Sequence, residues 1–143
     1  MRQCRIDKHP RFQPKSLPVT AAYHTPCHTR ALAGLSPWLE LLEKIPNLEL
    51  VPLELGCSGM AGAYGLTQKN FAMSMRIGAD LIDRMRQPDL QIGLAECSSC
   101  KLQMEQGTST PTLHPLKLLA FACGLIPASQ IKLTPNNRSR VAT

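Results

Sequence analysis

Residues 91–100 read Gln91-Ile92-Gly93-Leu94-Ala95-Glu96-Cys97-Ser98-Ser99-Cys100. The apolar run over 91–95 has the length of a buried strand, and it passes directly into a helix that stops at Gly107. A strand that leads into a helix in this way is typical of parallel α/β proteins. The stretch therefore predicts an α/β fold in which Cys97 and Cys100 lie just beyond the carboxyl end of a strand.

The same alternation of strand and helix extends through most of the chain. Short apolar runs predict strands over 19–23, 48–53, 91–95 and 110–113. Helices are predicted from the N-cap Ser36 to Pro46-Asn47, from Thr67 to Arg86, from Cys97 to Gly107 and from Pro115 to Gly124. This order predicts a parallel sheet of about four strands, with helices on its faces and right-handed crossovers.

The predicted elements carry three expectations about packing. Pro52 argues against the second strand, because a proline cannot donate a hydrogen bond to a neighbouring strand. The long helix is expected to bury one face, formed by Phe71, Met75, Gly78, Leu81, Ile82 and Met85. The last helix is expected to bury Leu116, Leu119, Ala120 and Cys123.

The length and composition predict one domain with two basic ends. The chain has 143 residues, of which 43% are hydrophobic, so it is long enough for one core. Residues 1–18 contain three prolines and no apolar period, and are expected to form an arm or linker. A cysteine-rich α/β domain is expected over 19–127, and a basic tail over 128–143.

The net charge of +6 arises mainly in these ends. Residues 1–30 hold six Lys/Arg and one acid, and residues 128–143 hold three Lys/Arg and no acid. Residues 31–127 hold seven Lys/Arg and nine Asp/Glu, so the expected core is slightly acidic. We therefore expect solvated basic arms and no nucleic-acid partner.

The chain shows no sign of export or of membrane insertion. No apolar stretch reaches the roughly 18 residues that a membrane span requires, and the start lacks the apolar segment of a secretory signal. A cytoplasmic protein keeps its thiols reduced, so six cysteines indicate a metal or redox site rather than a disulfide framework.

Four of the cysteines fall directly after predicted strands. Cys27 follows the first strand, Cys57 follows the second, and Cys97 and Cys100 follow the third. Ligands of an open parallel sheet bind outside the carboxyl ends of its strands. The four thiols are therefore predicted to converge on one edge of the sheet.

Each cysteine has a physical reason to bind a metal or cluster. The start of a helix lowers the pKa of a thiol, which favours the thiolate form of Cys97 and Cys100. Cys57 lies among glycines, whose bare backbone can approach an inorganic group and donate N–H bonds to sulfur. His24 and His28 flank Cys27, and are expected to be outer donors or packed side chains rather than ligands. Cys123 is expected in the core, and Cys4 as a free thiol.

Other interpretations of the cysteines stay open at this point. Four thiolates also suit a structural zinc ion, which would make the chain an interaction domain. Cys97 and Cys100 could form a redox pair at a helix start, as in thioredoxin-like enzymes. The four thiols could also be buried without any ligand. The usual nucleotide, hydrolase and zinc-protease motifs and the ferredoxin cysteine run are missing from the sequence.

The chain resembles a known family in four stretches that occur in the family's order. They read YHTPCHTRAL (23–32), GCSGMAGAYGL (56–66), ECSSCKLQMEQGT (96–108) and LHP (113–115). These stretches resemble the cysteine-rich "CCG" domain. That domain occurs in the heterodisulfide reductase B subunit, the glycolate oxidase iron–sulfur subunit and the anaerobic glycerol-3-phosphate dehydrogenase C subunit. The likeness is greatest to the carboxyl-terminal module of FAD-linked oxidases fused to an iron–sulfur half.

The resemblance implies an iron–sulfur protein. Its family ligands fall on Cys27, Cys57, Cys97 and Cys100, which would hold a [4Fe–4S] cluster or, in some relatives, zinc. Ser58 departs from the pattern, which has a second cysteine there, and this leaves a site with four thiolates. The surroundings of the centre are expected to include His24, His28, Gly59 and His114.

The function expected from residues and resemblance together is electron transfer. The chain would relay electrons for a flavin-dependent oxidation of a small hydroxy acid or glycerol 3-phosphate, without being catalytic by itself. FAD-containing and ferredoxin-like domains or subunits are the expected partners. The expected location is the cytoplasm, or the inner face of a membrane through those partners.

Overall fold

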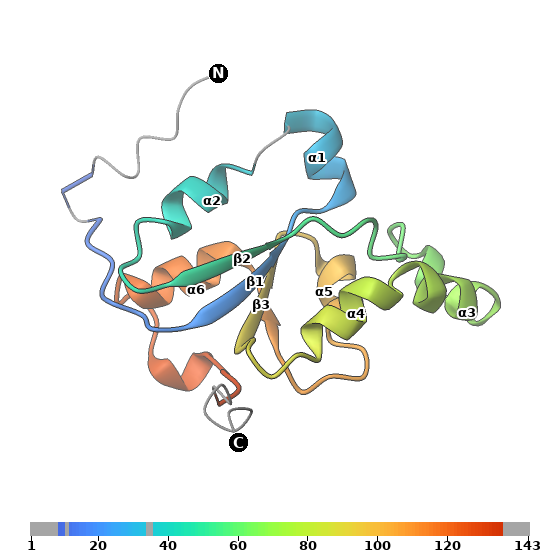
Figure 1. Cartoon of the computed structure of the whole chain (residues 1–143). Coiled ribbons are helices and arrows are strands. Elements are labelled where there is room, and N and C mark those ends of the chain that lie inside the picture. The colour runs from blue at the N-terminus through green and yellow to red at the C-terminus, as the bar shows by residue number, and fades with distance from the viewer. Residues whose placement is uncertain (1–8, 11, 34–35, 136–143) are drawn as a thin grey trace.

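Four parallel strands form a single sheet within the computed structural model, which describes residues 9–10, 12–33 and 36–135 (Figure 1). The strands are β1 (Thr20–His24), β2 (Glu49–Leu53), β3 (Ile92–Ala95) and β4 (Thr112–Leu113). Their order in the sheet is β2-β1-β3-β4, and all neighbouring pairs are parallel. The predicted α/β class and its four strands are therefore confirmed.

The helices lie between and after these strands. They are α1 (Cys27–Ala33), α2 (Pro37–Leu42), α3 (Gln68–Ile77), α4 (Ala79–Met85), α5 (Ser98–Met104) and α6 (Pro115–Ala122). Short 3-10 turns are η2 (Tyr64–Leu66) and η3 (Ala128–Gln130). The Ser36 side chain caps α2 by accepting a hydrogen bond from the backbone N–H of Trp38, as the Ser36-Pro37 pair predicts.

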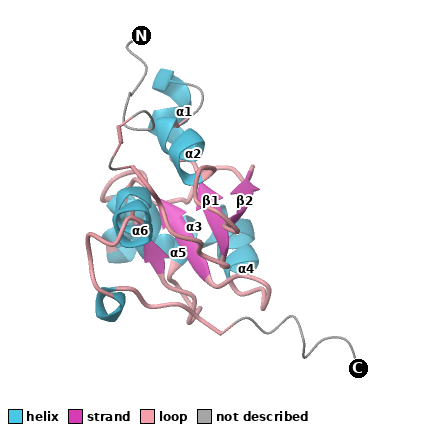
Figure 2. Ribbon diagram, turned by 90° about the vertical axis from the view of Figure 1, so that its left-hand side faces the viewer, coloured by secondary structure: helices cyan, strands magenta, loops and turns pink. Residues whose placement is uncertain are grey.

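Helices cover both faces of the sheet, with a separate apolar core on each side (Figure 2). The α2–α6 core contains Leu17, Val19, Ala21, Tyr23, Leu41, Leu42, Ile45, Ile92, Leu94, Leu118, Leu119 and Ala122. The α4–α5 core contains Ala22, Leu53, Leu81, Met85, Leu90, Ala95, Cys100 and Met104. Successive residues of β1 alternate between the two cores, which is the pattern of a strand buried on both faces.

Pro52 fits its strand because β2 lies at the edge of the sheet. The backbone N–H of Glu49 donates to the carbonyl of Val19. The backbone N–H and C=O groups of Glu49, Val51 and Leu53 therefore face β1. The nitrogen of Pro52 therefore faces away from β1, and no hydrogen bond of the sheet is lost. Pro52 is therefore compatible with the predicted strand, because β2 is an outer strand of the sheet.

The predicted long helix over 67–86 is two helices, because the chain changes direction at Gly78. Gly78 lies against the backbone carbonyl of Ser58, which leaves no room for a side chain. The helix α3 lies beyond α4, away from the sheet (Figure 1). As a result Phe71 is 47% exposed, and its prediction as a core residue was wrong; Leu81, Ile82 and Met85 of α4 are buried as predicted.

Two other predictions about helices need correction. The segment Cys27–Ala33 is a helix that the sequence did not indicate. In α6 the buried residues are Pro115, Leu118, Leu119 and Ala122, so the buried face is turned by about one residue from the expected one. Leu116 is 49% exposed, and Cys123 is only partly buried at the end of α6.

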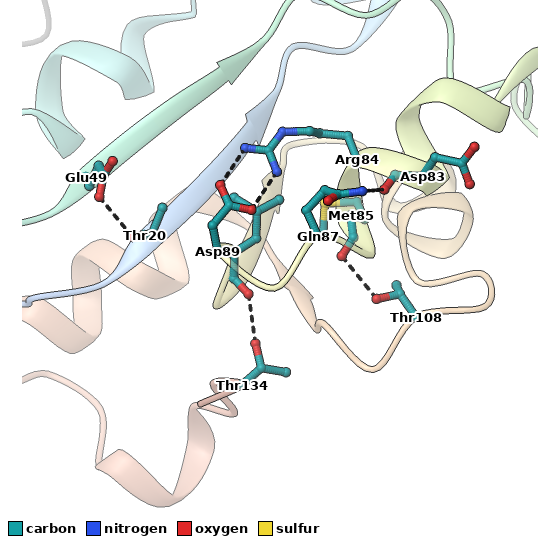
Figure 3. A network of polar contacts seen from close by, with 10 residues as sticks. Thr20, Glu49, Asp83, Arg84, Met85, Gln87, Asp89, Thr108 and Thr134 are labelled. Atoms are coloured by element: carbon teal, nitrogen blue, oxygen red, sulfur yellow. Dashed lines mark hydrogen bonds and ion pairs between the residues drawn. The ribbon is translucent and has the colours of Figure 1, made fainter. Parts of the chain in front are cut away.

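Polar contacts close the edge of the sheet at which β3 begins (Figure 3). Arg84 donates two hydrogen bonds of 2.9 Å to the carboxylate of Asp89. The Thr108 hydroxyl donates to the carbonyl of Met85 at 3.1 Å, and the Thr134 hydroxyl donates to the carbonyl of Leu90 at 3.1 Å. These hydrogen bonds hold the segments at this edge of the sheet together.

The expected division into arm, domain and tail stays a prediction. Leu17 packs in the α2–α6 core, and Thr134 bonds to the carbonyl oxygens of Leu90 and Gln91. Residues 1–8, including Cys4, and residues 136–143 lie outside the described residues.

The contact at Gly78 predicts a loss of stability on substitution. A Cβ at position 78 would meet the Ser58 carbonyl and would stand 2.8 Å from Nε2 of Gln103. We expect Gly78→Ala to lower the free energy of unfolding by about 1–3 kcal/mol, measured by urea titration with circular dichroism. Gly56→Ala is the matched control, because a Cβ there meets nothing within 4 Å. Equal stability of the two variants would contradict the described packing.

Candidate functional site

Three neighbouring strands bring four cysteines to one edge of the sheet (Figure 1). Cys27 is the first residue of α1 and follows β1 after two residues. Cys57 lies in the loop after β2, and Cys97, the N-cap of α5, is separated from the end of β3 by Glu96 alone. Cys100 is in the first turn of α5. Since β1 lies between β2 and β3, the cysteine-bearing segments are neighbours at the carboxyl edge.

Cys97 and Cys100 are close enough for each to shift the pKa of the other. Burial raises the pKa of the Cys100 thiol to about 12, the Ser58 hydrogen bond opposes this, and the charges of Cys97 and Cys27 add to it. Burial also acts to raise the pKa of Cys97, but hydrogen bonds from the backbone and side chains of Cys100 and Ser99 outweigh it and hold this pKa below its usual value. Cys97 is therefore the thiol of the pair that ionises first.

Ser58, the residue after Cys57, contacts one thiol of this pair. Its hydroxyl is buried and donates a hydrogen bond to the sulfur of Cys100 at 3.3 Å. Ser58 thus connects the loop after β2 to the sulfur of Cys100 on α5.

Gly59 brings its backbone close to the Cys57 sulfur in the loop after β2. The backbone N–H of Gly59 donates to the sulfur of Cys57 at 3.3 Å. Gly59 has a φ of 88°, and a Cβ on it would meet the backbone carbonyl of Ser74. The predicted role of glycine in bringing bare backbone to this sulfur therefore has a structural counterpart at Gly59.

The cysteines gather at one edge, but they do not form a closed set around one ion. Among the residues that the structure describes, no three His, Cys, Asp or Glu side chains are close enough together to hold a metal ion. A single zinc ion needs its thiolates about 2.3 Å from the metal, whereas a cluster of several irons and sulfides occupies more space. Four cysteine thiols, with the backbone N–H of Gly59 donating to the Cys57 sulfur, are a donor set of the kind that holds an iron–sulfur centre. The donor set therefore fits that group.

His24 ends β1 in the middle of this edge and is 1% exposed. Both of its ring nitrogens lack a hydrogen-bond partner in the described part of the chain. Burial, with a smaller effect from the charge of Arg30, lowers its pKa to about 4. A buried imidazole with no partner is costly, so its surroundings need an explanation.

The other two predicted histidines differ from His24. His28 lies on α1 and is exposed. His114 is the N-cap of α6, where its ring Nδ1 accepts a hydrogen bond from the backbone N–H of Leu116 at 3.1 Å. The ring of His114 also meets the edge of Trp38. The structure gives His114 a capping role, and its place near a bound centre stays a prediction.

Glu96 is a residue of this edge for which no role was predicted. Its carboxylate accepts hydrogen bonds from the hydroxyls of Tyr23 and Ser36, and from Thr29 at 3.3 Å. Tyr23 is buried, and burial together with the Glu96 carboxylate raises its pKa. Glu96 therefore joins α1, which begins at Cys27, to the segment that carries Cys97.

Thiols at the carboxyl ends of three adjacent parallel strands define the class of this protein as a cysteine-rich α/β domain. A family comparison is in agreement: residues 21–105 match the CCG family, described as "Cysteine-rich domain". The chain belongs to this family, and the resemblance found in its sequence motifs is confirmed.

Two kinds of characterised relative are similar to the chain. It is 38% identical over 118 residues to the C subunit of anaerobic glycerol-3-phosphate dehydrogenase from Escherichia coli strain K12, a match that covers 82% of this chain and 30% of the relative. It is 46% identical over 54 residues to lactate utilization protein A of Geobacillus thermodenitrificans, which covers 36% of this chain and 23% of that relative. The chain thus corresponds to less than a third of these relatives. No solved structure matches it.

The described residues contain no helix that is both long enough and apolar enough to span a membrane.

The Glu96 contacts predict a measurable coupling with Tyr23. Glu96→Ala should lower the free energy of unfolding by about 1–3 kcal/mol, because it leaves the buried Tyr23 hydroxyl without its acceptor. In Tyr23→Phe the same truncation should cost less, since the Tyr23 hydroxyl is no longer present to lose its acceptor. A double-mutant cycle by urea unfolding measures the difference, with the exposed Glu54→Ala as control. Strictly additive effects would show that the two side chains do not interact.

The burial of His24 predicts a loss of stability in acid. Its pKa of about 4 in the folded chain lies below the ordinary 6.5, so the unfolded chain takes up a proton first as the pH falls. His24 adds no pH dependence above pH 6.5, and between pH 6.5 and 4 it lowers the free energy of unfolding by up to about 3 kcal/mol.

Urea unfolding of the metal-free protein across this pH range tests this expectation. His24→Leu should remove this part of the pH dependence, while the exposed His28→Leu should keep it. The same pH dependence in wild type and His24→Leu would assign the effect to other groups.

Proposed function

We propose that the chain is an electron-transfer module that binds an iron–sulfur cluster of the [4Fe–4S] type through Cys27, Cys57, Cys97 and Cys100. The observation that carries this proposal is the delivery of these cysteines to one edge by the adjacent strands β2, β1 and β3. A second observation supports it. The Cys100 thiol feels the charges of Cys97 and Cys27 and accepts a hydrogen bond from Ser58, so three separate segments of the sequence lie near this sulfur.

A bound cluster would supply one-electron redox chemistry, and the chain's residues would set its potential. Hydrogen bonds to sulfur and partial burial are the means by which a protein tunes such a centre. Gly59 offers a backbone N–H at the Cys57 sulfur, and Ser58 offers a hydroxyl at the Cys100 sulfur. Glu96 would keep the Cys27 and Cys97 segments at a constant separation, which suits a centre that changes charge without moving.

The relatives support a place in a flavin-dependent oxidoreductase. One is named as the C subunit of an anaerobic glycerol-3-phosphate dehydrogenase and another as a lactate utilization protein. We propose that electrons from oxidation of glycerol 3-phosphate or a small hydroxy acid reach this module from an FAD-containing domain or subunit, together with ferredoxin-like partners. The proposed location is the cytoplasm, or the inner face of a membrane through those partners. Catalysis would belong to the assembly rather than to this chain.

A structural zinc site is the second candidate, because four cysteine thiolates suit tetrahedral zinc. Elemental analysis distinguishes the two. About one zinc per chain, no visible absorption and unfolding by a chelator would support zinc.

Anaerobic purification tests the proposed cluster. We expect a coloured protein that contains iron and acid-labile sulfide in equal amounts. Cys57→Ala should lose most of both, because it removes one of four ligands. Cys123→Ala is the matched control, since Cys123 ends α6 and follows none of the three strands that carry the site. A colourless wild-type protein without iron, sulfide or zinc would overturn both metal proposals.

A further inference from the structure

The position of His24 is fixed by its strand register. In the sheet His24 pairs with Leu53 of β2 on one side and with Ala95 of β3 on the other. Beyond Leu53 the chain continues to Cys57, and beyond Ala95 it continues to Cys97. His24 therefore occupies the centre of the edge at which the sulfur-bearing segments meet.

The face of the sheet on which His24 lies also follows from the register. Residues paired in parallel strands direct their side chains to the same face. Leu53 and Ala95, the two partners of His24, both pack in the α4–α5 core, and Cys100 belongs to that core as well. His24 is thus on the face that holds Cys100, and Ser58 bonds to Cys100 there.

The ring of His24 has hydrogen-bonding groups that the described chain does not use. An imidazole carries at least one N–H donor, and both nitrogens of His24 are buried without a partner among the described residues. A buried polar group in this state is unfavourable. Arg30 is the charged group that acts on His24, and its guanidinium donates instead to the carbonyl oxygens of Thr25 and Leu55. The missing partner is therefore an acceptor that the described part of the chain does not provide.

We propose that the ring N–H of His24 donates a hydrogen bond to a sulfur atom of the centre held by the four cysteines. This inference rests on the proposed cluster and deepens it, because it assigns the potential of the centre to one particular side chain. His24 acts as a positioning and tuning residue, without becoming a ligand of iron. Donation to sulfur stabilises the reduced, more negative cluster, so it raises the midpoint potential.

The experiment uses the full chain, reconstituted anaerobically with iron and sulfide. The midpoint potential is measured by a titration followed by electron paramagnetic resonance. His24→Leu should shift the potential to a lower value. His24→Asn or His24→Gln should restore part of the shift, since each replaces one ring N–H by an amide N–H at a different reach. The exposed His28→Leu, on the other side of Cys27, should leave the potential unchanged.

Two further readouts separate this role from a structural one. Protein labelled with ¹⁵N-histidine should show a weak nitrogen coupling in pulsed spectra of the reduced cluster, which is absent in His24→Leu and present in His28→Leu. Metal-free His24→Leu should melt at the same temperature as wild type or higher at pH 7, because it removes unpaired buried polar atoms.

The outcomes distinguish this inference from the proposed function. Wild-type protein without a cluster would overturn both. A cluster whose potential and spectra are the same in wild type and all His24 variants would overturn the role of His24 alone. It would indicate that a buried water is the hydrogen-bond partner of the His24 ring. A strong nitrogen coupling would also overturn it, since it would make His24 a ligand.

Discussion

The parallel pairing of β1 with both of its neighbours is the constraint on which the rest of the molecule depends. Because β2, β1 and β3 run in one direction, the segments that follow them emerge at one edge. The register brings Leu53, His24 and Ala95 to the same level, so loops far apart in sequence begin side by side. Because parallel neighbours need crossover connections, the helices that return the chain cross the faces of the sheet, where they cover the two cores.

Much of this architecture could be predicted, because strands buried on both faces have short apolar runs and clear boundaries. The helix at Cys27 was missed because the segment Cys27–Ala33 packs weakly and shows no apolar period. The break at Gly78 and the exposure of Phe71 were missed for a different reason. The helix α3 does not lie on the sheet, so its apolar residues do not report a buried face. In these places tertiary contacts decide the structure, and local pattern does not.

The candidate site divides in a similar way. The order of the elements alone places four cysteines at one edge, namely Cys27, Cys57, Cys97 and Cys100. This placement could therefore be predicted from the sequence. The contacts that surround the sulfur atoms could not. Glu96 bonds to Tyr23 across 73 positions of sequence, and the bond from Ser58 to Cys100 spans 42. Such contacts depend on how side chains pack after the strands have paired, which no local pattern of residues specifies.

Pro52 has a consequence beyond its own strand. Among the described strands β2 is an outer one, so its outer side is where a strand from another molecule could be added. The nitrogen that Pro52 turns outward has no hydrogen to offer, so the row of donors is interrupted near the end of the strand that leads to Cys57. The same residue that weakens the prediction of a strand thus works against fibril-like stacking of sheets between molecules.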